Sequence, residues 1–357
     1  MRTKWSVIGL MSGTSLDGLD LAFCQFDYED AKGWSFKIVA AECYPYSQSW
    51  KQKLNDAHLL SGLDLLLLDQ EYGQYIGEII VSFKDKFNAD PDFIASHGHT
   101  VFHRPDKRLS FQMGSGASIY AKTGIPVVCD FRSVDVNLGG QGAPLVPAGD
   151  AILFKEYDYC MNLGGIANIS FDKEGIRLAY DICGCNLLLN ALANEIGLEY
   201  DESGKIAETG VINNELLDML DQWDYYQKSA PKSLDKETML SELLPLIQDF
   251  PVSIADKLAT VSEHITFQIS KAIEKDAGSV LITGGGALNK TLVSKIKKKT
   301  ILKVIVPDEE LIHFKEALIF AFLGVLRVLN QNNTYASVTG ASHDSIGGAI
   351  YGGNFNS

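Results

Sequence analysis

The feature that most constrains the fold is a succession of segments that occurs twice. Near the N-terminus, an apolar strand at 6–10 is followed by a small-residue turn and a returning strand at 19–26. The succession recurs in mid-chain, with strands expected at 159–163, 168–171 and 177–182 around a glycine-containing turn. Few residue identities support a duplication, but two similar openings indicate two domains built on one plan.

The rest of the chain alternates between expected strands and helices, which indicates an α/β fold. Apolar residues at helical spacing predict a long amphipathic helix over 63–87. The further strands are 34–43, 93–96, 126–130, 279–283 and 302–306, and the further helices are 117–123, 186–196, 253–274, 288–298 and 309–329. The stretch 131–149 is rich in Gly and Pro, so a boundary is expected near its start. The expected domains are 1–137 and 138–337, with 338–357 returning to the first.

Composition excludes several classes of protein. With 46% hydrophobic and 21% charged residues, the chain of 357 residues is neither disordered nor short enough for one compact core. Its net charge of −14 argues against general binding of nucleic acid or an anionic membrane, so any phosphate must be bound locally. We expect neither a secretory signal nor a membrane span. Six scattered cysteines suit a reducing cytoplasm.

Three glycine-bearing turns follow expected strands, at 12–18, 162–168 and 283–289. In the first, Thr14 and Ser15 add hydroxyl donors for a phosphate, and Asp17 would hold Mg²⁺ directly or through water. An ordinary hairpin turn is the alternative. The consecutive glycines 284–286 leave a bare surface for a base or ribose. None of the turns has the ending of a Walker P-loop, but together they suggest a nucleotide in an interdomain cleft.

The carboxylate of Asp181, which follows the second turn, is a candidate general base. Asp181 ends an expected strand, immediately before Gly184 and the helix from Asn186. There it would project into the cleft and act as a general base on water or a hydroxyl. The alternative is an Asp near the helix N-terminus that stabilises that helix. The residues alone leave the two open.

Three histidines lie close together in the first half of the chain. The spacing of His97, His99 and His103 could suggest a metal site. No cysteine or second histidine cluster completes such a site. We therefore favour polar residues that line the cleft.

Two further groups of residues flank the expected cleft. Arg132 offers a fork suited to a carboxylate or to a pair of sugar hydroxyls, and a local pair with Asp130 or Asp135 that braces the loop is the alternative. Cys183 and Cys185 are too few for a metal site, so we interpret them as packing residues, with incidental thiols near a helix N-terminus as the alternative.

Taken in order, these segments resemble a known family. The first turn, MSGTSLDG at 11–18, resembles the signature of bacterial anhydro-N-acetylmuramic acid kinases. Further similar segments lie at 96–100, 123–132, 139–147, 162–168, 231–233, 284–286 and 338–341. The resemblance therefore covers nearly the whole chain. Its long segment GGQGAPLVP at 139–147 is highly specific.

The resemblance implies a fold and a reaction. The family belongs to the sugar kinase, heat-shock chaperone and actin superfamily, with two duplicated actin-like (ribonuclease H-like) α/β domains and an interdomain ATP cleft. Its members convert 1,6-anhydro-N-acetylmuramic acid, ATP and water into N-acetylmuramic acid 6-phosphate and ADP during peptidoglycan recycling. This implies a cytoplasmic phosphotransferase with ATP and Mg²⁺ as cofactors and a small anhydro sugar as partner. A homodimer is left open.

The resemblance also implies roles for single residues. Asp181 matches the catalytic base. The expected ATP-binding residues are Gly13, Thr14, Ser15, Leu16, Asp17, Gly18, Leu19, Asp20, Gly164, Gly165, Gly284, Gly285 and Gly286. The expected substrate residues are His97, Asp130, Arg132 and Asn186.

The chain departs from the family near the expected catalytic base. The family usually has Asp-Thr-Gly-Pro-Gly-Asn, and this chain has Asp181-Ile182-Cys183-Gly184-Cys185-Asn186. Ser133 stands where the family has Arg, residues 237–239 replace an aromatic pair, and His99 replaces a usual Gln. These changes affect the expected substrate contacts more than ATP binding. A kinase for another anhydro sugar, such as 1,6-anhydroglucose, and a nucleotide-gated binding module remain as alternatives.

Overall fold

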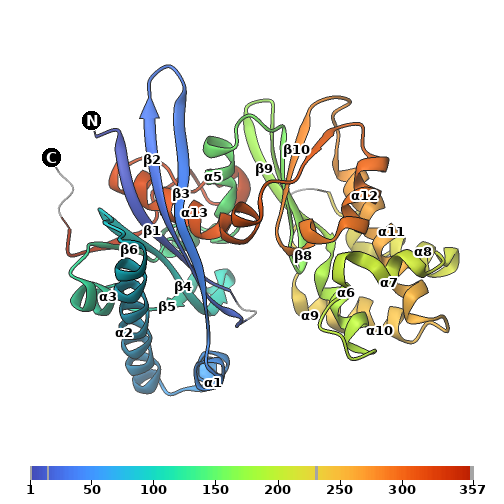
Figure 1. Ribbon diagram of the computed structural model, residues 1–357, viewed down its shortest axis with the longest axis horizontal. Coiled ribbons are helices and arrows are strands. Elements are labelled where there is room, and N and C mark those ends of the chain that lie inside the picture. The colour runs from blue at the N-terminus through green and yellow to red at the C-terminus, as the bar shows by residue number, and fades with distance from the viewer. Residues whose placement is uncertain (1, 14–15, 230–231, 354–357) are drawn as a thin grey trace. The chain divides into compact units, whose positions relative to one another are not determined.

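The computed structural model describes residues 2–13, 16–229 and 232–353, and it divides into two compact units (Figure 1). Unit 1 comprises Met1–Phe154 together with Phe314–Ser357, and unit 2 comprises Lys155–His313. In Figure 1 the blue N-terminal strands and the red C-terminal helix α13 (Glu309–Val328) both contribute to unit 1.

Unit 1 is built on a mixed sheet. Its strands are β1 (Lys4–Ser12), β2 (Gly18–Glu29), β3 (Gly33–Pro45), β4 (Phe93–Arg104), β5 (Leu109–Met113), β6 (Val127–Cys129) and β12 (Ala349–Tyr351). Within the described residues it has seven strands in the order β12-β6-β4-β1-β2-β3, with β5 paired to β4. β1, β2 and β3 pair antiparallel, whereas β1, β4 and β6 run parallel.

Helices pack around this sheet, and the longer ones contribute apolar residues to its core, such as Ile76 and Ile119. The helices are α1 (Gln48–Asp56), α2 (Gly62–Phe87), α3 (Gly116–Thr123), α4 (Ser133–Asn137), α5 (Val146–Leu153), α13 and α14 (Ala336–Thr339), with short 3-10 turns η1 (Ala57–Leu59) and η2 (Pro105–Lys107). The Ser61 hydroxyl caps α2 by accepting from the Asp64 N–H at 3.2 Å. Gly9 of β1 lets α13 approach closely, since a Cβ there would lie 2.0 Å from the Ala317 carbonyl oxygen.

The bounds of unit 1 differ from the expected domain bounds at 137/138 and 337/338. The cause is packing beyond the Gly- and Pro-rich loop. Asp150 of α5 pairs with Lys315 of α13 at 2.8 Å, and both side chains are buried. The Phe154 ring packs against Phe36 of β3, with centroids 5.3 Å apart. Both α5 and the C-terminal part of α13 therefore belong to unit 1.

Unit 2 has a smaller mixed sheet. Its strands are β7 (Tyr159–Leu163), β8 (Ile166–Lys173), β9 (Ile176–Gly184), β10 (Ser279–Thr283) and β11 (Lys303–Ile305). Their order is β11-β10-β7-β8-β9, with five strands in the part of the chain described. β7, β8 and β9 pair antiparallel, whereas β7, β10 and β11 run parallel.

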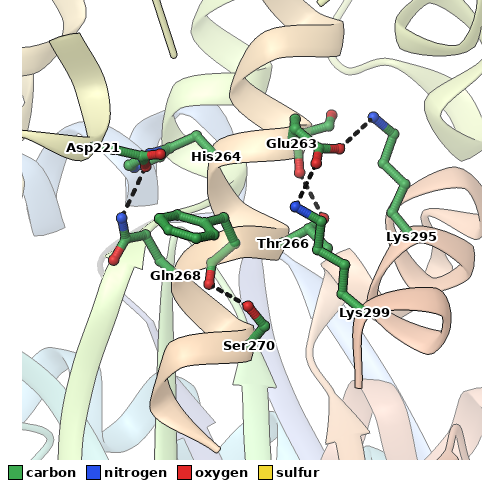
Figure 2. Close-up of polar contacts among 10 residues, drawn as sticks. Asp221, Glu263, His264, Thr266, Gln268, Ser270, Lys295 and Lys299 are labelled. Atoms are coloured by element: carbon green, nitrogen blue, oxygen red, sulfur yellow. Dashed lines mark hydrogen bonds and ion pairs between the residues drawn. The ribbon is translucent and has the colours of Figure 1, made fainter. Parts of the chain in front are cut away.

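The unit 2 core lies between this sheet and its helices. These are α6 (Asn186–Asn194), α7 (Lys205–Thr209), α8 (Asn214–Asp221), α9 (Lys236–Thr238), α10 (Leu244–Gln248), α11 (Ile254–Ala272) and α12 (Lys290–Lys299), with the short helices η3 (Glu202–Gly204), η4 (Asp224–Gln227), η5 (Met239–Leu243) and η6 (Gly285–Leu288). Helix α11 contributes Leu258, Val261 and Ile265 to the core. On its other side, Glu263 pairs with Lys295 and Lys299 of α12 at 3.3 and 2.5 Å (Figure 2).

The two sheets share one topology. In each, the first strand of the unit pairs antiparallel with the second, the second with the third, and two later strands add in parallel on the other side of the first. This repeat confirms the prediction of two duplicated α/β domains of the ribonuclease H-like, actin-like kind. Among the helices of the described residues, none has both the length and the hydropathy needed to cross a membrane.

Candidate active site

In unit 1, the sequence-predicted residues lie in or after three parallel strands. The first glycine turn follows β1, His97 lies within β4, and Asp130 and Arg132 follow β6. The register pairs Leu10 with Ser96 and Ser12 with His99. Because carboxyl ends of parallel strands share one edge of a sheet, the fold brings these positions together.

The first turn joins β1 to β2, and it is only partly described. Thr14 and Ser15 lie outside the described residues. The Gly13 carbonyl accepts from the Leu16 N–H at 3.3 Å, and Leu16 has a positive φ of 60°. Asp17 is exposed, so its carboxylate is available to a cation. Gly18, Leu19 and Asp20 already belong to β2, and Leu19 is buried in the core.

A buried network of hydroxyls, which the sequence analysis missed, lies behind this turn. The Ser12 hydroxyl contacts the Tyr46 hydroxyl at 2.8 Å and Nδ1 of His99 at 3.1 Å. Tyr46 in turn contacts the Tyr72 hydroxyl at 2.6 Å. Burial lowers the pKa of His99 to about 4, so the ring is neutral near pH 7. The network fixes the end of β1, from which the turn begins.

His97 and Arg132 form the centre of the predicted substrate region. Nε2 of His97 lies 3.1 Å from Nε and 2.7 Å from Nη2 of Arg132, while Nδ1 contacts the Gly98 carbonyl at 2.8 Å. Burial, followed by the charge of Arg132, holds the pKa of His97 well below its usual range. The imidazole is therefore neutral, with Nδ1 as donor and Nε2 as acceptor. Arg132 also donates to the Gly142 carbonyl, which orients the guanidinium.

The acidic residues of this loop make other bonds than the Asp–Arg pair that the sequence left as an alternative. Asp130 accepts from the Ser133 hydroxyl at 2.5 Å. Asp135 is buried and accepts from the Gly142 N–H and the Thr339 hydroxyl, both at 2.7 Å. Asp135 thus braces the Gly- and Pro-rich loop through these two bonds rather than through Arg132.

Glu316 of α13 is a further charged group near Arg132 that the sequence analysis missed. Burial raises the pKa of the Glu316 carboxyl, and the charge of Arg132 opposes that rise. Nothing in the sequence distinguished Glu316 from its neighbours.

The three histidines point to different partners. His97 contacts Arg132, His99 contacts Ser12, and Nδ1 of His103 contacts the Ser110 hydroxyl at 3.0 Å. No group of three or more His, Cys, Asp or Glu side chains suited to a metal ion occurs in the described part of the chain.

In unit 2, the second and third glycine turns lie side by side. They follow the parallel strands β7 and β10, where Asn162 is in register with Thr283. A Cβ on Gly286 would lie 2.7 Å from the Leu163 Cβ, and one on Gly284 would lie 2.2 Å from Asn162 Oδ1. Only glycine permits this approach of the two turns.

Asn186 connects these turns to the strand that carries Asp181. Its N–H donates to the Gly164 carbonyl at 3.1 Å, and its Nδ2 donates to the Leu163 carbonyl at 3.0 Å. A Cβ on Gly165 or Gly285 would meet nothing closer than 3.8 and 3.6 Å, so the backbone there is bare. Bare backbone of this kind admits a flat base or a phosphate.

Asp181 is held by residues that lie about 50 positions later in the chain. Its N–H donates to the Lys232 carbonyl at 3.0 Å, and its Oδ2 accepts from the Leu234 N–H at 2.9 Å. Burial raises the pKa of the Asp181 carboxyl, and hydrogen bonds from the Leu234 N–H and the Ser233 hydroxyl oppose that rise. A raised pKa brings the carboxylate closer to the range suited to a general base.

The alternative role of Asp181, near the N-terminus of the next helix, is wrong. The N-cap of α6 is Cys185, and Asp181 lies inside β9. The β8–β9 pairing is irregular directly after Asp181, between its partner Asn168 and Ala167. Such an irregularity changes the direction of the side chains that follow it.

Comparison with known proteins settles the family. Residues 5–353 match the family described as anhydro-N-acetylmuramic acid kinase. The chain belongs to this family. It is 35% identical to the anhydro-N-acetylmuramic acid kinase of Hydrogenovibrio crunogenus, covering 96% of this chain and 97% of that one. It is 33% identical to the enzyme of the same name from Zymomonas mobilis, covering 96% and 99%.

Solved structures give a much weaker likeness. A ROK family glucokinase from Streptomyces griseus, in complex with glucose and AMPPNP, matches with a TM-score of 0.40 and 12% identity. The match covers 89% of this chain and 98% of that one. At this level the likeness supports no statement about the site.

The departures from the family near Asp181 are packed into the core of unit 2. Ile182, Cys183 and Cys185 are 3%, 0% and 0% exposed, and all three belong to the main apolar cluster. The interpretation of the two cysteines as packing residues is confirmed. These substitutions therefore change the support beneath the site rather than its surface.

Proposed function

We propose that this chain phosphorylates 1,6-anhydro-N-acetylmuramic acid with ATP and water, giving N-acetylmuramic acid 6-phosphate and ADP. The observation that carries the proposal is Asp181. It is a half-buried carboxyl with a raised pKa, in the unit that also brings two glycine turns together. Family membership supplies the substrate, and Asp181 supplies the group that the reaction requires. We place the reaction in the cytoplasm, which six free cysteines support.

The chemistry requires a base because an anhydro sugar has no free 6-hydroxyl. We assign to Asp181 the removal of a proton from water as the water attacks the anomeric carbon. The Leu234 N–H holds Oδ2 of Asp181 at 2.9 Å and so fixes the plane of the carboxylate. The C1–O6 bond then breaks, and O6 becomes the nucleophile for phosphorus.

The remaining residues would hold the nucleotide and the sugar. The bare backbone at Gly165 and Gly285 fits a nucleotide, and the exposed carboxylate of Asp17 fits Mg²⁺ directly or through water. ATP and Mg²⁺, when bound, supply the phosphoryl group and the positive charge that stabilises its transfer. We assign recognition of the sugar to Arg132, His97, Asp130 and Asn186, because these side chains offer hydrogen-bond donors and acceptors.

A coupled assay of ADP release tests the proposal. The purified chain is given Mg²⁺-ATP with 1,6-anhydro-N-acetylmuramic acid, with 1,6-anhydroglucose, or with no sugar. We expect release that depends on the anhydro-muramic sugar. Release with anhydroglucose alone would assign a different anhydro sugar, and nucleotide binding without release for either sugar would indicate a binding module.

A further inference from the structure

The backbone and the carboxylate of Asp181 are both bonded to one distant segment. We call residues 223–229 and 232–234 the clamp segment. The Tyr225 hydroxyl donates to the Asp181 carbonyl at 2.6 Å, and the Leu234 N–H donates to Oδ2 at 2.9 Å. The Asp181 N–H donates to the Lys232 carbonyl at 3.0 Å. The place of the carboxylate therefore depends on the place of the clamp segment.

The clamp segment is anchored to helix α11 by a buried chain of polar groups. The Tyr226 hydroxyl contacts Nε2 of His264 at 2.8 Å, and Nδ1 of His264 contacts Oδ1 of Asp221 at 2.5 Å. Asp221 also accepts from Nε2 of Gln268 at 2.9 Å (Figure 2). Because Nδ1–H of His264 donates to the Asp221 carboxylate, Nε2 accepts the hydrogen bond from the Tyr226 hydroxyl. The His264 side chain is 0% exposed, so its ring has a fixed orientation.

Apolar packing leaves the clamp segment few other arrangements. Tyr225, Leu234 and Met239 form a buried cluster, and Tyr226 packs against it. The Lys232 ammonium lies 4.5 Å from the Tyr225 ring centroid and donates to the Tyr225 carbonyl at 3.3 Å. These contacts keep Tyr225 and Leu234 on the same side of Asp181.

We propose that Tyr226, held by His264 and Asp221, is a positioning residue for the general base. It fixes the clamp segment so that the Tyr225 hydroxyl and the Leu234 N–H both reach Asp181. Tyr226 itself contacts His264 and not the reacting atoms. The inference rests on the proposed function, since only a base needs one productive position. It assigns a catalytic purpose to a polar chain that would otherwise only stabilise unit 2.

The pKa of the Asp181 carboxyl depends on the groups around it, so it reports whether the clamp segment is in place. The groups that interact with the carboxyl are Tyr225 from η4, Cys183 on its own strand, and the Ser233 hydroxyl of the clamp segment. Burial raises the pKa of Tyr225 and of Cys183, so both stay protonated near neutral pH. Loss of the Leu234 hydrogen bond removes an influence that lowers the pKa of Asp181. The carboxyl would then titrate at a higher pH.

The test compares Tyr226→Phe with Tyr159→Phe. The control also removes one buried hydroxyl from unit 2, which accepts from the N–H groups of Glu274 and Lys275 at 3.1 and 3.2 Å. The first measurement is the pH dependence of kcat/KM for the anhydro sugar, with kcat and the KM for ATP. The second is amide hydrogen exchange in the peptides that contain Asp181 and Leu234, which does not depend on turnover.

For Tyr226→Phe we expect kcat to fall about ten- to a hundredfold with the KM for ATP unchanged. The acid limb of kcat/KM should move upward by up to about one pH unit. Amide exchange in the peptides that contain Asp181 and Leu234 should become faster. In Tyr159→Phe, kcat, the acid limb and the exchange rates should stay as in the wild type. Tyr225→Phe, which removes the hydroxyl bonded to Asp181 itself, should reproduce the lower kcat.

Each other outcome has a definite meaning. A wild-type acid limb and wild-type exchange in Tyr226→Phe would overturn the positioning role, and so would equal changes in Tyr226→Phe and Tyr159→Phe. If the wild type itself turns over no anhydro sugar, the proposed function fails. The exchange data then decide alone whether Tyr226 holds the clamp segment on Asp181.

Discussion

Nε2 of His97 accepts from the guanidinium of Arg132 at 2.7 Å, so a buried cation is oriented by a neutral ring rather than by a carboxylate. Burial lowers the pKa of Arg132 to about 10, and the group still keeps its charge near neutral pH. A guanidinium whose positive charge is not cancelled by a hydrogen-bonded carboxylate is suited to bind an anionic or hydroxyl-rich ligand.

Arg132→Gln should weaken binding of the sugar. We expect the KM for the anhydro sugar to rise about ten- to a hundredfold, the effect of losing a hydrogen bond to a charged group, while the KM for ATP stays close to wild type. Steady-state kinetics with each substrate varied in turn measures both. Arg177→Gln is the matched control, because Arg177 is buried in unit 2 and bonds Ser170 and Asp172. An equal rise in both variants would contradict a specific role for Arg132.

Asp181→Asn should abolish most turnover and leave the affinity for ATP unchanged. Removal of a general base lowers kcat by about 10²–10⁴-fold, while the glycine turns that would hold ATP are unchanged. Single-turnover kinetics measures the rate of the chemical step, and calorimetric titration measures the affinity for ATP. Asp158→Asn is a suitable control, since Asp158 also accepts a backbone N–H in unit 2, from Ser279 at 2.8 Å. Near-normal kcat in Asp181→Asn would remove Asp181 from the mechanism.

The same substitution should also change the dependence of stability on pH. Because the folded-state pKa of Asp181 is raised above the unfolded value, the ionised carboxyl destabilises the folded state above that pKa. Asp181→Asn should therefore unfold at a higher temperature than the wild type at neutral pH. This advantage should shrink as the pH falls through the raised pKa toward the unfolded value. Calorimetric scans of both proteins across that pH range measure the two unfolding temperatures. A difference between them that does not change with pH would contradict the raised pKa.

Isotope transfer separates this chemistry from ordinary phosphorylation of a hydroxyl. In ¹⁸O-labelled water, the product should carry label on C1 when it is analysed before ring opening exchanges that oxygen. The transferred phosphate should carry no solvent oxygen, because its bridging oxygen is O6 of the sugar. Mass spectrometry of the product reads both positions. Label in the phosphate would mean that water attacked ATP first.

A substitution far from the chemistry tests the packing of α13. Gly9→Ala would place a methyl group 2.0 Å from the Ala317 carbonyl oxygen, so β1 and α13 must move apart. Such overpacking destabilises by about 1–3 kcal/mol or more. Gly62→Ala is the control, because a Cβ there meets nothing within 4 Å. Urea denaturation should show a lower midpoint for Gly9→Ala only.

The sequence predicts the framework of both sheets because their central strands are continuous apolar runs. The strands at the openings of the two units were located to within a few residues, as were the long helices α2, α11 and α13. It misses β5 and β12, which are short and lie at the edges of pairing. It also misses the extension of β4 to Arg104, because Gly98, with a φ of 74°, reads as the end of a strand.

For the candidate site, too, the sequence predicts what depends on local context and misses what depends on long-range contacts. The glycine turns follow strands and Asp181 lies near the end of one, and that local context is visible in the sequence. The partners of Asp181 are not, because Tyr225 and Leu234 come from a region without apolar periodicity and meet Asp181 only through the fold. Glu316 was hidden for the same reason, since its proximity to Arg132 depends on how α13 lies against the sheet.

The split of unit 1 along the chain bears on the order in which a ribosome would complete this protein. Unit 2 is one continuous stretch, and all of its strands have been synthesised when translation reaches residue 313. Unit 1 then still lacks most of α13, which packs on Gly9, and the strand β12. The side of β1 that faces α13 therefore stays uncovered until that helix is made, which lengthens the exposure of this part of the nascent sheet to chaperones and to aggregation.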